Sequence, residues 1–180
     1  MIAIIDYGVG NIFSLSASLK YIGEEACLTH DKDIIHRADR VILPGVGAFA
    51  DARNKLLQSG MDKAVQSEAS DGKPILGICL GMQLMFERSF EYGEYEGLGL
   101  IGGDVVPIRD VCKDKVKIPH MGWNKLSFPK KNELFSLCSE GEYVYFVHSY
   151  CASNCSDYVI AQTDYGAPVT AAAANKNVYA

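Results

Sequence analysis

The sequence lacks the features that would place it in a membrane or on nucleic acid. Its longest apolar runs are interrupted by Asp, Lys, Arg or Gly well before the roughly 18 residues that a membrane span needs. The N-terminus carries neither a basic stretch nor a small-residue cleavage site. No block of Lys and Arg occurs, and the formal net charge is -5, so the clustered positive charge that phosphate binding requires is missing. We therefore expect a cytoplasmic protein whose partners are small molecules or proteins, with no nucleic acid and no membrane.

The cysteines do not form the pattern of a disulfide framework. A chain of 180 residues with 48% hydrophobic composition can bury one core without covalent staples, so reduced thiols are expected. Cys151 and Cys155 are four residues apart, but no second Cys or His pair stands at matching spacing. The sequence therefore predicts no metal site and a single domain over residues 1–180. The six cysteines are Cys27, Cys79, Cys112, Cys138, Cys151 and Cys155.

The N-terminal half alternates short apolar runs with segments of helical periodicity. This alternation predicts right-handed βαβ crossovers and a mostly parallel sheet that is covered on both faces, which is an α/β fold. The C-terminal half changes to strand-like runs joined by turns, and these should add antiparallel strands to the same core. The predicted strands are residues 2–6, 26–29, 41–43, 74–78, 104–108, 115–118, 143–150, 158–163, 169–173 and 177–180. The predicted helices are residues 12–22, 50–57, 61–69 and 80–86.

The most informative residues lie at the junction of a buried strand and a helix, where Gly77 and Gly81 flank Cys79 at a distance of two residues. Such glycines permit the tight turn that raises a nucleophile above the edge of a sheet, as in the serine elbow of hydrolases. A thiol at a helix N-terminus is favoured as the reactive thiolate. The N–H of Leu80 could face the oxyanion of a tetrahedral intermediate. The alternative is a buried structural thiol between chance glycines.

Longer motifs extend this pattern over nearly the whole chain. The string from Gly77 to Gln83 is similar to the nucleophile motif of class I glutamine amidotransferases. Four further strings, at residues 6–11, 43–49, 119–124 and 145–150, resemble the glutaminase subunits of imidazole glycerol phosphate synthase and stand in the order of that family. The resemblance implies a three-layer, flavodoxin-like class I amidotransferase fold and no cofactor.

The resemblance also implies a reaction and a partner. L-Glutamine is hydrolysed to glutamate and ammonia through a cysteinyl thioester, which splits a difficult amide hydrolysis into two acyl transfers. The ammonia passes to a (β/α)8-barrel cyclase subunit that makes imidazole glycerol phosphate in histidine biosynthesis. Glutaminase subunits of other synthases, such as those making pyridoxal phosphate or anthranilate, are the alternative within enzymes. The strings at residues 6–11 and 119–124 argue against them.

The resemblance also implies roles for individual residues. The loop Gly45, Val46 and Gly47 matches the oxyanion strand, whose N–H groups complete the oxyanion hole with Leu80. The residues expected to bind the substrate glutamine are Gln83, Glu91, His148, Ser149 and Tyr150. Glu91 is expected to face the ammonium group, although its acidic neighbours also suit a solvated face. The positions expected at the subunit interface are Asn11 and Trp123.

The sequence departs from the family near its end. The family supplies a His and a Glu from a His-Pro-Glu motif on a strand close to the C-terminus, but here no His follows Pro168 and no Glu follows Glu142. We therefore expect the chain to stop short of that segment, which the natural gene product should contain, and the 180-residue chain to be a poor glutaminase. A non-catalytic, glutaminase-like structural subunit would show the same absence.

Overall fold

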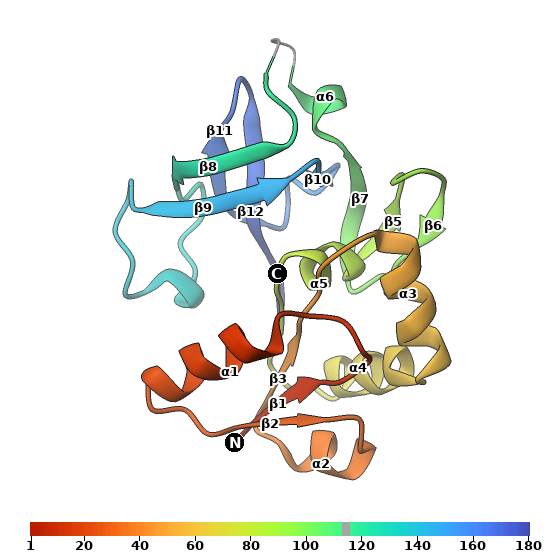
Figure 1. Ribbon diagram of the computed structural model, residues 1–180. Coiled ribbons are helices and arrows are strands. Elements are labelled where there is room, and N and C mark those ends of the chain that lie inside the picture. Colours follow the sequence, from red (N-terminus) through yellow and green to blue (C-terminus); the bar gives the residue numbers. More distant parts are fainter. Residues whose placement is uncertain (113–115) are drawn as a thin grey trace.

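The computed structural model describes residues 1–112 and 116–180 and has a seven-stranded central sheet (Figure 1). The strand order is β11-β12-β13-β4-β3-β1-β2. The five strands from β13 to β2 are parallel, while β12 and β11 are antiparallel additions at one edge. The predicted combination of a parallel sheet with antiparallel strands is therefore confirmed. The strands are β1 (Ile2–Ile5), β2 (Ala26–Thr29), β3 (Arg40–Leu43), β4 (Ile75–Gly77), β11 (Val159–Asp164), β12 (Pro168–Asn175) and β13 (Val178–Tyr179).

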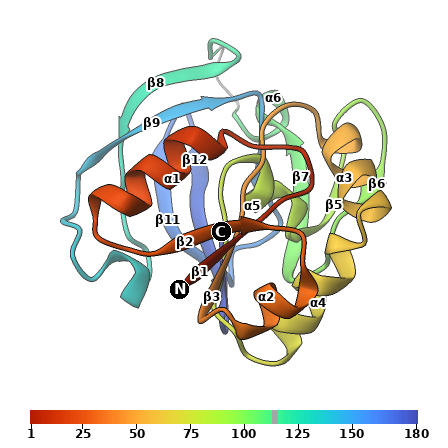
Figure 2. The same ribbon diagram turned by 60° about the horizontal axis from the view of Figure 1, so that its bottom comes forward.

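Side chains alternate between the two faces of each strand, so the parallel strands present apolar side chains on both faces. Helices cover both of these faces. In β1, Ile2 and Ile4 pack in the cluster that contains Leu19 of α1, whereas Ala3 and Ile5 belong to the main core beneath the other helices. Figures 1 and 2 show α1 on one side of the sheet and α2, α3 and α4 on the other. These helices are α1 (Ile12–Tyr21), α2 (Lys32–Arg37), α3 (Phe49–Gln58) and α4 (Met61–Ser70).

The short helix α2 is not among the predicted elements. It has six residues, too few for a periodic apolar pattern to stand out. Its start is nevertheless fixed locally, because the Asp31 carboxylate accepts hydrogen bonds from the N–H groups of Asp33 (2.8 Å) and Ile34 (3.4 Å). Asp31, as an N-cap residue, was thus the sequence signal that could have indicated the start of α2.

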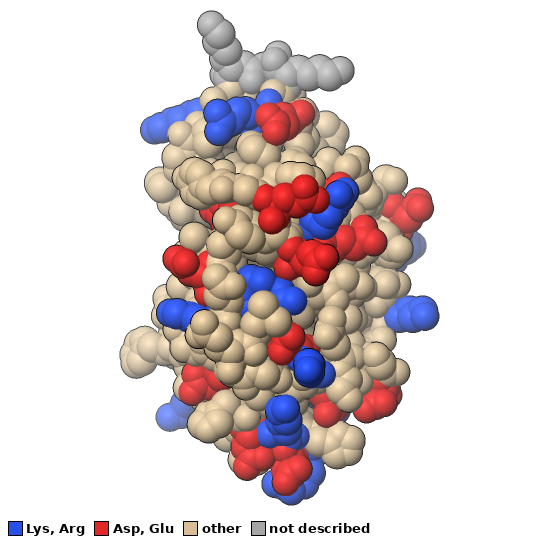
Figure 3. Space-filling view, turned by 90° about the vertical axis from the view of Figure 1, so that its right-hand side faces the viewer, with Lys and Arg blue, Asp and Glu red and all other residues tan. Residues whose placement is uncertain are grey.

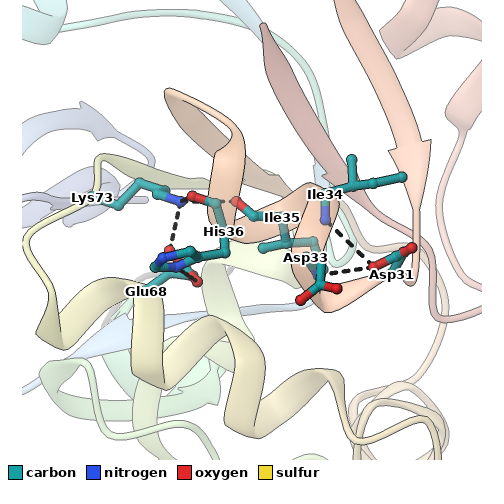
Figure 4. Close-up of polar contacts among 7 residues, drawn as sticks. All are labelled: Asp31, Asp33, Ile34, Ile35, His36, Glu68 and Lys73. Atoms are coloured by element: carbon teal, nitrogen blue, oxygen red, sulfur yellow. Dashed lines mark hydrogen bonds and ion pairs between the residues drawn. The ribbon is translucent and has the colours of Figure 1, made fainter.

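An ionic cluster around the buried Glu68 ties α2 to α4 (Figure 4). Glu68 lies between the Lys73 ammonium, 2.6 Å from its Oε2, and the His36 ring, 3.1 Å from its Oε1. Lys73 also donates to the main-chain carbonyls of Ile35 (2.8 Å) and His36 (2.6 Å). Burial opposes ionisation of Glu68, but hydrogen bonds from Lys73 and His36 outweigh it and lower the pKa of the carboxyl. The cluster therefore fixes the turn that leads into β4.

The remaining strands form two smaller sheets beside the central one. One has the order β10-β7-β5-β6, and the other is the antiparallel β8–β9 hairpin. The predicted strand over 104–108 is the end of β7, and the predicted strand over 143–150 is divided between β9 and β10. The bounds are β5 (Phe86–Ser89), β6 (Tyr95–Glu96), β7 (Ile101–Pro107), β8 (His120–Lys125), β9 (Tyr143–His148) and β10 (Tyr150–Ser153), with the short helices α5 (Leu80–Leu84), α6 (Ile108–Val111) and η1 (Glu133–Phe135).

The predicted strand over 115–118 is wrong for residues 116–118, and residue 115 lies outside the described residues. The strand in this region is β8, which begins at His120. Its inward positions include His120 and Asn124, whereas Met121 and Trp123 point outward and are exposed. This reverses the usual pattern of apolar residues inside and polar residues outside. A search for apolar alternation therefore could not find β8.

The surface around α3 and α4 carries both signs of charge. On this face, Lys and Arg side chains are interspersed with Asp and Glu side chains (Figure 3). Such mixing gives no continuous positive field of the kind that attracts a polyanion. Over the described residues, no helix is both long and apolar enough to cross a membrane.

Candidate active site

The turn between β4 and α5 raises Cys79 out of the core. Cys79 has φ 57 and ψ -115, so a non-glycine residue adopts a positive φ at the point where the strand becomes a helix. Such a conformation costs on the order of 1–3 kcal/mol and persists only where the surroundings impose it. The thiol is free and exposed, unlike the buried thiols of Cys112, Cys151 and Cys155. The tight strand-to-helix turn predicted around Cys79 is therefore present in the backbone.

Glycines impose this turn because their neighbours leave no room for a side chain. A Cβ at Gly81 would lie 1.9 Å from the Leu43 carbonyl oxygen, and one at Gly77 would lie 2.7 Å from the Gly81 oxygen. A Cβ at Gly45 would approach the Gly81 nitrogen to 2.5 Å. The obstructing atoms belong to the main chain, which cannot move aside cheaply. The elbow and the loop after β3 are therefore packed backbone against backbone.

A cavity of about 400 Å³ opens beside Cys79. Four residues predicted for catalysis or substrate binding are distributed around it: Cys79 and Gln83 from the elbow, and His148 and Tyr150 from the ends of β9 and β10. Much of the remaining wall is apolar, with Leu126, Phe135, Val144 and Phe146 among its residues. The size and the few polar groups suit a small molecule.

Hydrogen bonds orient the backbone at the polar end of this cavity. The Tyr150 carbonyl accepts from Gln83 Nε2 (3.3 Å) and from His148 Nδ1 (2.8 Å). The Ser149 carbonyl accepts from the N–H of Ile108 at 3.0 Å, and Ser149 does not line the cavity. The segment from His148 to Tyr150 thus meets the cavity through its two ends, while its middle is tied to α6.

Two histidines continue this network away from the cavity. His148 Nε2 lies 2.9 Å from His120 Nδ1, and His120 Nε2 lies 3.1 Å from the Asn124 Oδ1. Burial lowers the pKa of His148, the Tyr150 carbonyl opposes this shift, and the charge of His120 adds to it. Sequence reasoning assigned no chemistry to His120 or Asn124. The polar inward positions of β8 were the signal that could have identified them.

Glu91 lies at the edge of this region and does not line the cavity. Its Oε2 accepts a hydrogen bond of 2.5 Å from the N–H of Phe49, the first residue of α3, whose N-cap Ala48 has no side-chain acceptor. Burial raises the pKa of Tyr150, and the nearby Tyr92 and Glu91 raise it further. Glu91 therefore caps α3, and its charge is felt by the Tyr150 hydroxyl.

The loop after β3 closes over the start of α5. The Gly45 carbonyl accepts a hydrogen bond of 3.3 Å from the N–H of Leu80, so this N–H is already engaged. Gly47 has φ 94, and Val46 between the two glycines is exposed. The Tyr7 hydroxyl donates to the Pro44 carbonyl at 2.6 Å and anchors the loop at its first residue. The four predicted oxyanion residues thus lie together, but with the Leu80 N–H turned toward protein.

The predicted interface residues occupy two separate elements. The Asn11 side chain accepts from the N–H of Ser14 (3.3 Å) and caps α1. Trp123 is 67% exposed and packs edge-on against Tyr145 at 5.6 Å between ring centroids. An exposed Trp in this position is available for contact with another protein.

One group of side chains could in principle approach a cation. His36, Glu68 and Asp71 offer ligand atoms that lie within 4.8 Å of one another. The Lys73 ammonium, however, already lies 2.6 Å from Glu68 Oε2 and supplies the positive charge there. We assign no metal to this group.

Comparison with known proteins identifies the family. The model of the class-I glutamine amidotransferase family matches residues 3–180. The chain belongs to this family. Relatives named imidazole glycerol phosphate synthase subunit HisH include those of Oceanobacillus iheyensis, 46% identical over 99% of this chain and 87% of the relative, and Sulfurimonas denitrificans, 48% identical over 99% and 86%.

Solved structures support the amidotransferase fold. A structure described as a glutamine amidotransferase superposes with a TM-score of 0.75 at 16% identity, covering 99% of this chain and 87% of the other. A structure of PurLQS from Thermotoga maritima gives a TM-score of 0.70 at 21% identity, covering 99% and 84%. At these identities the likeness concerns the fold alone.

Proposed function

We propose that this amidotransferase is the glutaminase subunit of an imidazole glycerol phosphate synthase and that Cys79 is its nucleophile. The observation that carries the proposal is the exposed Cys79 thiol on a strained elbow beside a cavity that also contains Gln83. The names of the relatives favour this synthase over others. The cavity takes L-glutamine, and the Gln83 side chain and the Tyr150 end of β10 hold its head group.

In the proposed reaction, the Cys79 thiolate attacks the carboxamide carbon of glutamine. A carbon–sulfur bond forms, the carbon–nitrogen bond breaks, and ammonia leaves after it receives a proton. Water then attacks the thioester and releases glutamate and the thiol. Each half is an acyl transfer through a tetrahedral oxyanion, which backbone N–H groups can stabilise.

The oxyanion hole requires a rearrangement of the loop at Gly45, Val46 and Gly47. The Leu80 N–H now donates to the Gly45 carbonyl, so it must exchange that acceptor for the substrate oxygen. The glycines on either side of Val46 provide the backbone freedom for such a rotation. Loss of one oxyanion donor typically costs about 10²- to 10³-fold in rate, so the position of this loop controls turnover.

A general acid and base is also required, and the rings of His36, His120 and His148 are already engaged by other groups. Both ring nitrogens of His148 are engaged, one by the Tyr150 carbonyl and the other by His120. His36 contacts Glu68 in the cluster between α2 and α4. We therefore propose that residues 1–180 alone hydrolyse glutamine slowly, because ammonia leaves without an efficient proton donor.

The exposed outer face of the β8–β9 hairpin is the proposed contact for the cyclase subunit. Met121 pairs with Val147 and Trp123 pairs with Tyr145, and all four side chains are more than half exposed. Neighbouring exposed aromatic and apolar side chains of this kind are typical of protein interfaces. Both this hairpin and α1, which Asn11 caps, lie toward the left of Figure 1.

The test is a glutaminase assay of the chain with the cyclase subunit, comparing Cys79→Ala with Cys138→Ala. Cys138 is also an exposed thiol, but it does not line the cavity beside Cys79. We expect Cys79→Ala to abolish glutamate release and Cys138→Ala to leave it unchanged. Equal activity of Cys79→Ala and the wild type would disprove the assignment of the nucleophile.

A further inference from the structure

The pair of histidines behind the cavity has an unusual set of hydrogen-bond partners. At one end, His148 Nδ1 faces the Tyr150 carbonyl, which can only accept. At the other end, His120 Nε2 faces the Asn124 Oδ1. The orientation of the Asn124 amide is fixed because its Nδ2 donates to the Asp164 carbonyl at 3.2 Å. Both outer nitrogens of the pair therefore carry hydrogen.

The contact between the two rings requires a third hydrogen. His148 Nε2 and His120 Nδ1 are 2.9 Å apart, so one of them must donate to the other. Two neutral imidazoles together carry only two N–H hydrogens, but these three hydrogen bonds require three. If all three contacts are hydrogen bonds, the pair holds one additional proton and a charge of +1.

The surroundings favour His120 as the ring that carries this charge. His120 is fully buried and lies between two aromatic faces, with centroids 3.8 Å from Tyr165 and 4.7 Å from Phe146. Burial disfavours a charged ring, but aromatic faces attract a cation and this attraction, which is greatest where water is excluded, offsets part of that cost. Burial and the neighbouring charge lower the pKa of His148, which keeps that ring neutral.

The described residues supply no carboxylate that neutralises the pair. The titratable groups in contact with His120 are His148 on β9 and Tyr165. The Tyr165 hydroxyl donates to the Lys117 carbonyl. Asp164 takes part through its main-chain carbonyl, and no ion pair of His120 occurs among residues 1–112 and 116–180. The proton is therefore held by hydrogen bonds and aromatic faces alone.

We propose that His120 and His148 share one additional proton and form a cationic bridge that positions the Tyr150 carbonyl in the glutamine cavity. The bridge runs from Asn124 on β8 to the same carbonyl that Gln83 contacts from α5. Loss of the proton leaves two hydrogens for three contacts, so one hydrogen bond breaks and the carbonyl is held less firmly. His120 is thus a positioning residue, and its effect on glutamine binding rests on the proposed function.

The protonation state can be measured directly by ¹⁵N-histidine NMR of the wild-type chain, with His30→Gln and His36→Gln used to assign two of the four rings. At neutral pH we expect both nitrogens of His120 to have imidazolium shifts, whereas His148 has one protonated nitrogen. A neutral His120 with a single N–H between about pH 6 and pH 8 would disprove the bridge.

The positioning role is tested by a ratio of two labelling rates of Cys79. The numerator is the rate with a chloroketone analogue of glutamine, and the denominator is the rate with iodoacetamide. The ratio removes changes in the reactivity of the thiol itself. His120→Gln should weaken binding of the analogue roughly three- to tenfold, the effect of one hydrogen bond, with the iodoacetamide rate unchanged. In the wild type, the ratio should fall when the pair loses its additional proton, and this dependence should vanish in His120→Gln.

The matched control is His30→Gln, the same substitution at an exposed histidine, which should behave as the wild type. An unaltered ratio in a folded His120→Gln would refute positioning even if the NMR confirmed the charge. Failure of the analogue to label Cys79 in the wild type would instead refute the proposed function, because the NMR result does not depend on glutamine.

Discussion

The parallel half of the molecule, residues 1–84, and the β8–β9 hairpin hold their parts of the site by different means. In the parallel half, the Cys79 elbow is fixed by main-chain atoms that pack against Gly77 and Gly81. In the hairpin, the inward face is fixed by side chains, through the bridge of His120 and His148, while the outward face remains exposed. The proposed nucleophile thus depends on backbone sterics, whereas the opposite wall depends on side-chain hydrogen bonds and aromatic packing.

The largest expected effect is that of Gly81→Ala in the parallel half. The added Cβ would lie 1.9 Å from the Leu43 oxygen, so β3 and the elbow must separate. We expect a loss of at least about 4 kcal/mol in the free energy of unfolding, measured by urea denaturation. Gly72→Ala is the control: it has φ +84 but open space around its Cβ, and should cost only about 1–2 kcal/mol. Equal losses would mean that the elbow is not sterically fixed.

The next largest effect is expected in the ionic cluster around Glu68, which we expect to stabilise the parallel half. Glu68→Gln removes the charge that balances the mostly buried Lys73 ammonium. Breaking such a buried pair should cost about 3 kcal/mol in unfolding free energy, whereas Glu25→Gln on the surface should change it by less than about 0.5 kcal/mol. Because the folded pKa of Glu68 is lowered, its contribution is present above the pKa of an unfolded Glu and is lost on acidification. A cost below about 1 kcal/mol would contradict this role.

A smaller and pH-dependent effect is expected in the hairpin. The folded pKa of His148 is lowered, so its neutral form stabilises the fold above the unfolded His pKa of about 6.5. That contribution is lost as pH falls through the lower folded value. We expect the unfolding free energy of the wild type to decline more steeply below about pH 6.5 than that of His148→Gln. Parallel pH profiles for the two proteins would show that His148 does not resist protonation.

The smallest effect on stability is expected on the outward face of the hairpin. Trp123 is 67% exposed, so Trp123→Ala should change the unfolding free energy by less than about 0.5 kcal/mol. If this face binds the cyclase subunit, the same substitution should weaken that complex by about 2 kcal/mol, measured by calorimetric titration. Tyr21→Ala, at an aromatic residue that is 92% exposed at the end of α1, gives the comparison for a general surface effect. Unchanged cyclase affinity in Trp123→Ala would exclude the tryptophan from the interface.

The same difference explains what the sequence could predict. The elbow was predictable because glycine spacing and an apolar strand are local signals, and the parallel order follows from alternating strands and helices. The bridge was not, because it joins β8 to β9 through residues 28 apart and uses polar residues at inward positions. The contact of Glu91 with Phe49 likewise joins residues 42 apart, so the α3 cap was invisible in the sequence.

Mass spectrometry of the chain treated with the chloroketone analogue shows whether the Cys79 thiol attacks a ligand that is bound as glutamine is proposed to bind. Cys138 is an exposed thiol in the same molecule and serves as the internal comparison. We expect an adduct on Cys79 that forms first and is suppressed by added L-glutamine. Adducts that appear equally on Cys79 and Cys138, with no protection by glutamine, would contradict it.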